Sequence, residues 1–170
     1  MVRKIIGGLF VVVACGGFGH AFADQKKIEI GYFRSLIRSI ELMKCELRYR
    51  MTPLPQLCKI SGGCDKDLIG QWFCRLGELL EQKEVPDIDG CTKEVMMLVP
   101  QYHPHIADAL FLLCQSLGRF DLHGQLEGLD AVLDRCKTEL GHLTEEIDQK
   151  KRTIQTLGVC AGIALAILML

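Results

Sequence analysis

The chain has 170 residues, a formal net charge of −1 and nine cysteines. Its length suffices for one domain with short appendages but not for two ordinary domains. Basic and acidic residues are spread along the middle of the chain without forming a basic face, which disfavours nucleic-acid binding. Aromatic residues are few, and Leu, Glu, Lys and Ile recur at helical spacing, so we expect an all-α protein.

The first residues allow three interpretations. The run 5–23 follows two basic residues and contains no Asp, Glu, Lys or Arg. This pattern fits a membrane helix, a signal peptide cleaved after Ala23, or a lipoprotein signal that ends at Val12-Val13-Ala14-Cys15. As a helix the run would be about 28 Å long, close to the thickness of a hydrocarbon core. We predict an N-terminal membrane anchor over residues 1–24.

Apolar residues then step by three and four, which predicts a long amphipathic helix from Lys26 to about Met51. The members of the stripe are Phe33, Leu36, Ile40, Met43 and Leu47. Two prolines end this helix, because proline lacks the backbone N–H and disfavours helical geometry in the residue before it. We expect Thr52 to cap a short second helix that has Pro53 at its first position, continues through Leu54 and runs to about Ile60.

Three more helices are predicted before the final one. They are expected over about residues 65–82, 89–98 and 103–117, with start signals at Asp65, at Asp89 or Cys91-Thr92, and at His103-Pro104. Gly118 can take the left-handed conformation that ends the third of these, and Asp121 can cap the helix that follows.

The final fifty residues carry an alternation of four and three that is typical of a heptad seam. Its members are Leu122, Leu126, Leu129, Leu133, Cys136, Leu140, Leu143 and Ile147, and the phase resumes at Ile154 and Leu157. From Thr153 onward no side chain is charged, and this tail would be about 27 Å long as a helix. We predict a C-terminal membrane anchor over residues 153–170, in a helix whose seam packs antiparallel against the first long helix.

Together these patterns predict an all-α fold: an antiparallel six-helix bundle over residues 25–152, flanked by an N-terminal and a C-terminal transmembrane helix. Five cations border the bundle, and we expect them at the membrane interface: Lys26, Lys27, Lys150, Lys151 and Arg152. By the positive-inside rule, these cations favour a bundle that lies in the cytoplasm. The predicted partner of the two terminal helices is the lipid bilayer.

Candidate catalytic and metal-binding residues are weak. His103 and His105 form the best metal pair, but a proline separates them and no Cys-x-x-Cys motif accompanies them. The scattered cysteines are typical of buried thiols in a reducing compartment, and no phosphate-binding loop is present. The acidic stretch 144–148 is typical of a solvated helix face. We predict no enzyme, no cofactor, no metal and no small-molecule substrate.

One corner between the last two helices contains a charged residue without a structural role. Gly118 and Asp121 serve the helix ends there, which leaves Arg119 unexplained. A carboxylate near the end of the first long helix, Glu46, is the predicted partner of Arg119.

Short motifs along the chain, in this order and spacing, resemble the stage III sporulation protein AB family of endospore-forming bacteria. They are Glu46-Leu47-Arg48-Tyr49, Thr52-Pro53-Leu54, the corner Ser116-Leu117-Gly118-Arg119-Phe120-Asp121 with Gln125, and Thr156-Leu157-Gly158-Val159 before the apolar tail. The chain departs from the family at Phe120, where the family often has His. The structural or partner candidates are therefore Glu46, Thr52, Pro53, Leu54, Gly118, Arg119, Asp121 and Gln125.

The resemblance implies a non-enzymatic membrane platform or scaffold subunit in a secretion-like complex that crosses the envelope between mother cell and forespore. The family's soluble domain is similar to cytoplasmic domains of the inner-membrane platform proteins of type II secretion and type IV pili. The implied partners are other stage III sporulation proteins, among them the motor ATPase stage III sporulation protein AA. The implied location is the mother-cell membrane around the forespore, with the soluble domain facing the cytoplasm.

Two other functions remain open at this point. The first is an exported or lipid-anchored helical protein that binds in the envelope, which follows if the N-terminal run is a signal peptide. The second is a Cys/His hydrolase, although no cysteine lies in a recognisable nucleophile motif.

Overall fold

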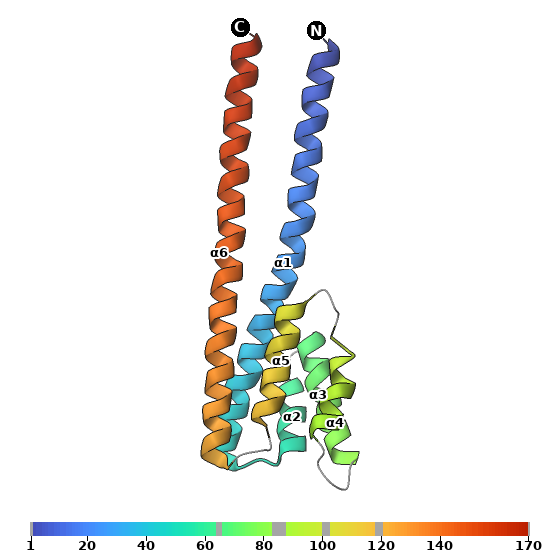
Figure 1. Cartoon of the computed structure of the whole chain (residues 1–170), viewed down its shortest axis with the longest axis vertical. Coiled ribbons are helices and arrows are strands. Elements are labelled where there is room, and N and C mark those ends of the chain that lie inside the picture. Colours follow the sequence, from blue (N-terminus) through green and yellow to red (C-terminus); the bar gives the residue numbers. More distant parts are fainter. Residues whose placement is uncertain (1, 64–65, 83–87, 100–102, 118–120, 170) are drawn as a thin grey trace. The chain divides into compact units, whose positions relative to one another are not determined.

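The computed structural model describes residues 2–63, 66–82, 88–99, 103–117 and 121–169, with side chains for residues 26–63, 66–82, 90–99, 103–117, 121–154, 156 and 157. These residues form six α helices and no strand (Figure 1). The helices are α1 (Val2–Arg50), α2 (Leu54–Gly62), α3 (Leu68–Gln82), α4 (Ile88–Met96), α5 (Pro104–Ser116) and α6 (Leu122–Met169). The expected all-α fold and its six helices are confirmed.

The chain forms two compact units. The bundle unit is Glu29–Leu140, and the terminal unit combines Met1–Ile28 with Gly141–Leu170. Both α1 and α6 contribute to each unit, whereas α2, α3, α4 and α5 belong to the bundle unit alone. The limits predicted at residues 24 and 152 concern the membrane and stay predictions.

The predicted stripe on α1 forms part of the bundle core. Phe33, Leu36, Ile40 and Met43 are fully buried, and Leu47 is 7% exposed. Two small polar residues, Ser35 and Ser39, are buried with them, and Ser39 Oγ donates a hydrogen bond to the carbonyl oxygen of Ser61 at 3.3 Å. Because Ser61 lies on α2, this bond ties α2 to the first long helix.

Helices α2 and α3 approach each other closely, and two glycines allow it. A Cβ atom at Gly62 would lie 2.7 Å from the carbonyl oxygen of Gly70, and one at Gly77 would lie 2.8 Å from that of Pro55. On α3, Trp72 and Phe73 are fully buried and meet edge to face, with ring centroids 5.1 Å apart. Trp72 is the largest fully buried side chain among the described residues.

In the bundle unit, α6 runs antiparallel to α1. Lys137 Nζ of α6 lies 3.4 Å from Glu41 Oε1 of α1, and Lys44 of α1 pairs with Asp130 of α6. The higher-numbered residue of one helix therefore faces the lower-numbered residue of the other. The α6 seam is buried at Leu129, Leu133 and Cys136 but not at its beginning, where Leu122 is 38% exposed.

The helix starts correct two sequence predictions. Thr52 does not cap α2: the N-cap position is Pro53, and the Thr52 hydroxyl donates to Glu46 instead, because the chain turns back toward α1. For α3 the capping side chain is Asp67, whose Oδ1 accepts from the Gly70 N–H at 3.0 Å. The expected cap Asp65 lies outside the described residues.

Two other helix ends were predicted with more success. Asp121 Oδ1 accepts from the Gly124 N–H at 3.0 Å, so the predicted cap of α6 is confirmed. Helix α5 starts at Pro104 as expected and ends at Ser116, with Leu117 in an extended conformation at φ −88° and ψ 135°. The left-handed cap expected at Gly118 lies outside the described residues.

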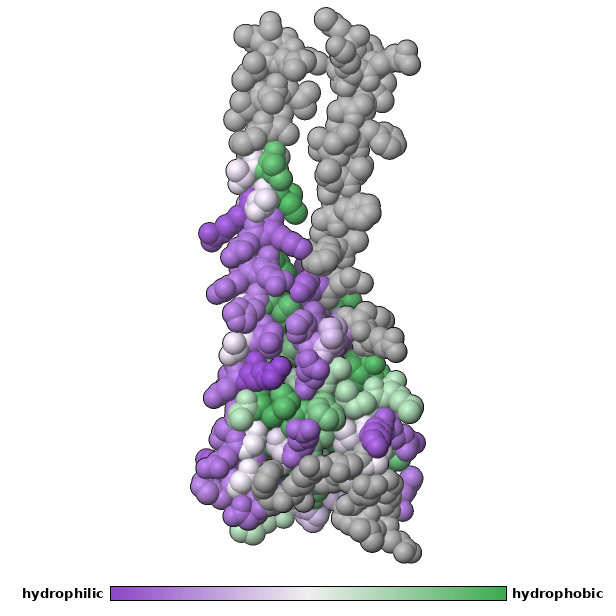
Figure 2. All heavy atoms as spheres, viewed as in Figure 1, coloured by the Kyte–Doolittle hydropathy of each residue, from purple (hydrophilic) through white to green (hydrophobic). Residues whose placement is uncertain are grey.

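The terminal unit also pairs α1 with α6. Lys26 Nζ lies 3.0 Å from Glu146 Oε2, and the seam residues Leu143 and Ile147 are buried. Figure 2 shows a hydrophilic outward face along the described part of α6, with hydrophobic residues again at its end. There Ile154 and Leu157 are 51% and 64% exposed.

None of the helices, over the residues that were described, is long and apolar enough to cross a membrane. The two predicted membrane anchors, residues 1–24 and 153–170, have their side chains largely outside the description. The backbone of the first segment is helical from residue 2, and the backbone of the second is helical to residue 169.

Candidate functional site

The turn between α1 and α2 has an unusual backbone conformation. Met51 has a φ of 49°, and it is the one residue other than glycine with positive φ in the described part of the chain. A residue with a side chain is strained in this left-handed region, typically by about 1–2 kcal/mol. Such strain persists where neighbouring interactions impose it.

One carboxylate holds this turn from both sides. Glu46 Oε2 accepts a hydrogen bond from Thr52 Oγ1 at 2.9 Å, and Glu46 Oε1 lies 3.3 Å from Arg50 Nη1. The Glu46 side chain is 11% exposed, so these bonds are partly shielded from water. Glu46 thereby links the residues on either side of Met51.

The turn leaves two large side chains in solvent. Tyr49 is 77% exposed and Met51 is 72% exposed. Arg48 precedes Tyr49 in the sequence and is also exposed. It has no side-chain ion pair or hydrogen bond among the described residues. Tyr, Met and Arg are the residue types enriched where proteins bind other proteins.

An open groove of about 340 Å³ adjoins the turn on α1 and α6. Its lining residues are Glu41, Lys44, Cys45, Arg48, Tyr49, Leu133 and Lys137. We call these seven residues, together with Met51, the corner surface. Two of its cations are already engaged, Lys44 by Asp130 and Lys137 by Glu41, so Arg48 is its one cation without a partner among the described residues.

The predicted site residues that the structure describes are not members of the corner surface. Glu46, Thr52 and Pro53 form the turn that supports it, and Leu54 is the first residue of α2. Asp121 and Gln125 stand at the start of α6, where the Gln125 N–H donates to the Asp121 carbonyl oxygen at 2.9 Å.

The predicted ion pair between Glu46 and Arg119 stays a prediction, because Gly118 and Arg119 lie outside the described residues. Among the described residues, Glu46 is bonded to Thr52 and Arg50. Sequence reasoning did not propose Met51, Leu133 or Lys137 as site residues, although it placed Leu133 in the heptad seam of the final helix. The apolar stripe of α1 could have indicated that Tyr49 is exposed, because Tyr49 lies outside that stripe.

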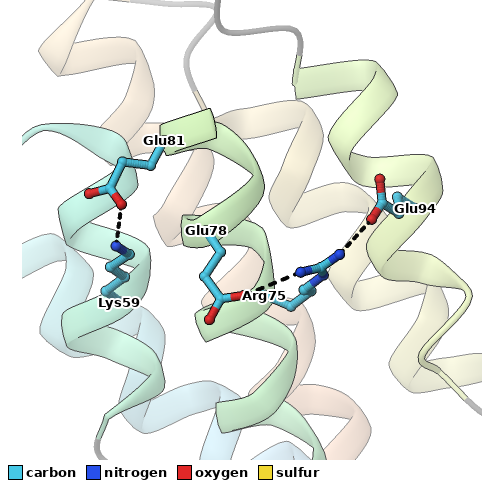
Figure 3. Close-up of polar contacts among 5 residues, drawn as sticks. All are labelled: Lys59, Arg75, Glu78, Glu81 and Glu94. Carbon is cyan, nitrogen blue, oxygen red and sulfur yellow. Dashed lines mark hydrogen bonds and ion pairs between the residues drawn. The ribbon is translucent and has the colours of Figure 1, made fainter. Parts of the chain in front are cut away.

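The surface of α2, α3 and α4 contains a second group of charges, and here each cation has a partner (Figure 3). Lys59 Nζ lies 2.5 Å from Glu81 Oε2. Arg75 reaches Glu78 Oε2 at 3.3 Å and Glu94 Oε1 at 3.0 Å, and its hydrogen bonds to these two carboxylates raise its pKa. The group links three helices and presents no unpaired cation, so it is a structural tie.

Another open groove, of about 430 Å³, lies between α5 and α6. Two small residues of its lining lie close together, since a Cβ atom at Gly128 would be 2.8 Å from the Cβ of Ser116. Arg135 lines this groove as Arg48 lines the other. The lining of the α5–α6 groove contains no Tyr or Met, and the groove does not adjoin the strained turn at Met51.

The cysteines and histidines do not assemble into a reactive centre among the described side chains. Burial, with Cys114 nearby, raises the pKa of Cys58 to about 12, and burial raises the pKa values of Cys114 and Cys136 to about 11. Such thiols are protonated at neutral pH and are weak nucleophiles. His103 is buried and meets the Tyr32 ring edge-on at 5.4 Å.

No grouping of three or more His, Cys, Asp or Glu residues that could hold a metal ion occurs among the described residues. In particular, His103 is 5% exposed whereas His105 is exposed. The two imidazoles of the candidate metal pair therefore lie in different environments.

The predicted interface cations lie on the terminal-unit segments of α1 and α6. Lys26 pairs with Glu146, and Lys151 Nζ lies 3.9 Å from Asp148 Oδ1. Lys27, Lys150, Lys151 and Arg152 are exposed.

A family model described as stage III sporulation protein AB matches residues 4–170, which is nearly the whole chain. No curated protein and no solved structure matches the chain. The match supports a role in stage III of sporulation. The chain therefore belongs to the stage III sporulation protein AB family.

Proposed function

We propose that the chain is a non-enzymatic platform subunit of the stage III sporulation complex that crosses the envelope between mother cell and forespore. Its terminal segments anchor it in the mother-cell membrane, and its bundle unit faces the cytoplasm. There it docks the motor ATPase, stage III sporulation protein AA. The observation that carries this proposal is the corner surface, an exposed and partly apolar site that adjoins the strained turn at Met51.

The membrane part of the proposal is supported by charge and by helix direction. Residues 5–23 and 153–170 contain no Asp, Glu, Lys or Arg. Lys26 of α1 pairs with Glu146 of α6, and in the bundle unit the same two helices run antiparallel. Cations flank each uncharged segment on its bundle side: Lys26 and Lys27 come after the first, and residues 150–152 come before the second. The positive-inside rule expects this of a cytoplasmic domain.

Cys45 provides a direct test of topology, because it is exposed on the corner surface. A membrane-impermeant maleimide should leave it unlabelled in intact mother cells and label it after permeabilisation. A Cys45→Ser variant is the control that identifies the labelled site. Labelling in intact cells would instead favour the exported or lipid-anchored envelope protein.

The docking part is tested by the location of the ATPase in sporulating cells. Stage III sporulation protein AA should sediment with membranes when this chain is present and remain soluble when the chain is deleted. Returning the wild-type chain should restore sedimentation. An ATPase that stays on the membrane in the deletion strain would contradict the proposed docking.

A further inference from the structure

We propose that the corner surface binds an acidic segment of its partner, in which a carboxylate pairs with Arg48 and a neighbouring apolar side chain covers Tyr49 and Met51. The inference rests on the proposed function, since it assigns the chemistry of the surface that docks the partner. Its basis is the combination of Arg48, which is unpaired among the described residues and lines the groove, with the exposed side chains of Tyr49 in the groove lining and Met51 in the adjoining turn.

The charges of the corner surface select the sign of the partner. Lys137 Nζ lies 3.4 Å from Glu41 Oε1, and Lys44 pairs with Asp130, so both lysines are occupied. Arg48 is exposed and unpaired in the described part of the chain. A guanidinium presents five N–H donors in a planar fork that matches a carboxylate with two parallel hydrogen bonds. A partner carboxylate satisfies this fork without breaking either lysine pair.

Helix stability does not explain these residues. A cation in the last turn of α1 interacts favourably with the helix dipole, but Arg50 occupies the same turn and also pairs with Glu46. Tyr49 and Met51 gain nothing from their exposure in the isolated bundle, since burial of apolar surface is what stabilises such side chains. The strained backbone conformation at Met51 also belongs to a residue whose apolar side chain is exposed to solvent. Binding of an apolar group at this position removes that surface from water.

A protein segment fits the site better than the other occupants. The groove is open and has a mixed polar and apolar lining, whereas small-molecule pockets enclose most of their ligand. Anionic lipids are recognised by clusters of 4–8 Lys or Arg residues, and the corner surface offers one unpaired cation. An acidic residue beside an apolar one on an amphipathic segment supplies both contacts.

Crosslinking tests the chemistry of the occupant independently of its identity. A photo-crosslinking residue in place of Tyr49 in the full chain, expressed in sporulating cells, should capture a peptide with Asp or Glu within four residues of the crosslink. Replacing that acidic residue by Lys should abolish capture by the wild-type chain and restore capture by an Arg48→Glu chain. Capture of a second copy of this chain, of lipid, or of a peptide without an acidic residue would overturn the inference.

Affinity for the proposed partner provides the quantitative test. With the full chain in detergent and purified stage III sporulation protein AA as the probe, Arg48→Glu should weaken binding at least tenfold, because a charge-assisted hydrogen-bonded pair is lost. Arg48→Lys should weaken it less, and added salt should weaken the wild type more than Arg48→Glu. Arg135→Glu makes the same charge change in the α5–α6 groove and should leave binding unchanged.

The outcomes separate the two proposals. If the ATPase binds the wild type and Arg48→Glu equally well, the acidic-segment inference is wrong while the proposed docking stands. If the ATPase does not bind the wild type, the proposed docking is wrong, and the crosslinked peptide from sporulating cells still decides whether the occupant is acidic.

Discussion

At the scale of single residues, the buried thiols show how strongly packing controls chemistry in this protein. Cys58 is fully buried on α2, and its pKa is raised from 9.0 to about 12. Burial disfavours the thiolate because a charge in the core loses its hydration. The side chain that would be nucleophilic on a surface is here a small hydrophobic core residue.

This pKa shift predicts a specific loss of stability at high pH. The folded state holds the proton more tightly than the unfolded state, so the contribution of Cys58 is complete below pH 9 and is lost as the pH rises toward 12. Between pH 8 and pH 10 the free energy of unfolding should fall by about 1.4 kcal/mol through this thiol. Urea denaturation of the full chain in detergent measures it, with Cys58→Ala as the control that lacks this part of the pH dependence. Equal pH dependence in the two proteins would contradict the prediction.

The strain at Met51 predicts that stability and binding separate at one position. Met51→Gly removes the side chain that disfavours a φ of 49°, so the free energy of unfolding should rise by up to about 1 kcal/mol. The same change removes an exposed apolar contact, so binding to the partner should weaken. Met51→Val should destabilise the protein, because a β-branched residue fits the left-handed region poorly. Urea denaturation and the binding assay with the ATPase measure the two effects. Lower stability in the glycine variant would show that the turn is not strained.

At the scale of helices, the fit between α2 and α3 depends on an absent side chain. A Cβ atom at Gly77 would lie 2.8 Å from the carbonyl oxygen of Pro55, and backbone atoms cannot move aside as a flexible side chain can. The sequence marks Gly77 as an unfavourable residue inside a helix, whereas the structure explains its presence by the close approach of α2.

Matched substitutions test this explanation. Gly77→Ala should destabilise the bundle by about 1–3 kcal/mol, because the added methyl group separates the two helices. Gly31→Ala on α1 meets nothing within 4 Å, so it should stabilise the chain by up to about 1 kcal/mol through helix propensity. Thermal and urea denaturation compare both variants with the wild type. A stabilising effect at Gly77 would mean that α2 and α3 can move apart without loss.

At the scale of the whole molecule, α1 and α6 are the two helices that contribute to both units. Continuous helices transmit displacement along their axis, whereas a flexible segment does not. We infer that movement produced by the ATPase at the bundle reaches the membrane through α6, whose seam is buried from Leu129 to Cys136 and again at Leu143 and Ile147.

An insertion in α6 tests this transmission. A seven-residue Gly/Ser segment after Lys150 should abolish spore formation while the ATPase remains bound, because the helix is interrupted between the bundle and the tail. A seven-residue helical insertion at the same place keeps the heptad phase and should retain function. Spore counts and membrane sedimentation of the ATPase are the measurements. Normal sporulation with the flexible segment would refute transmission through α6.

The sequence by itself determined the helices, the buried stripes of α1 and α6 and the cap at Asp121. These features depend on the helical period and on turn chemistry, which act between residues a few positions apart. The motifs also determined the family, because their order along the chain is a property of the sequence.

Only the tertiary structure decided what the α1–α2 turn does. Thr52 and Asp65 were expected to cap helices, but the hydroxyl of Thr52 bonds to Glu46, and the observed cap of α3 is Asp67. Arg48 and Tyr49 line a groove together with Leu133 and Lys137 of α6, and only the packing of α6 against α1 forms that groove. Such choices depend on which residues distant in sequence come together, because a side chain with several possible partners binds the one that packing places within reach.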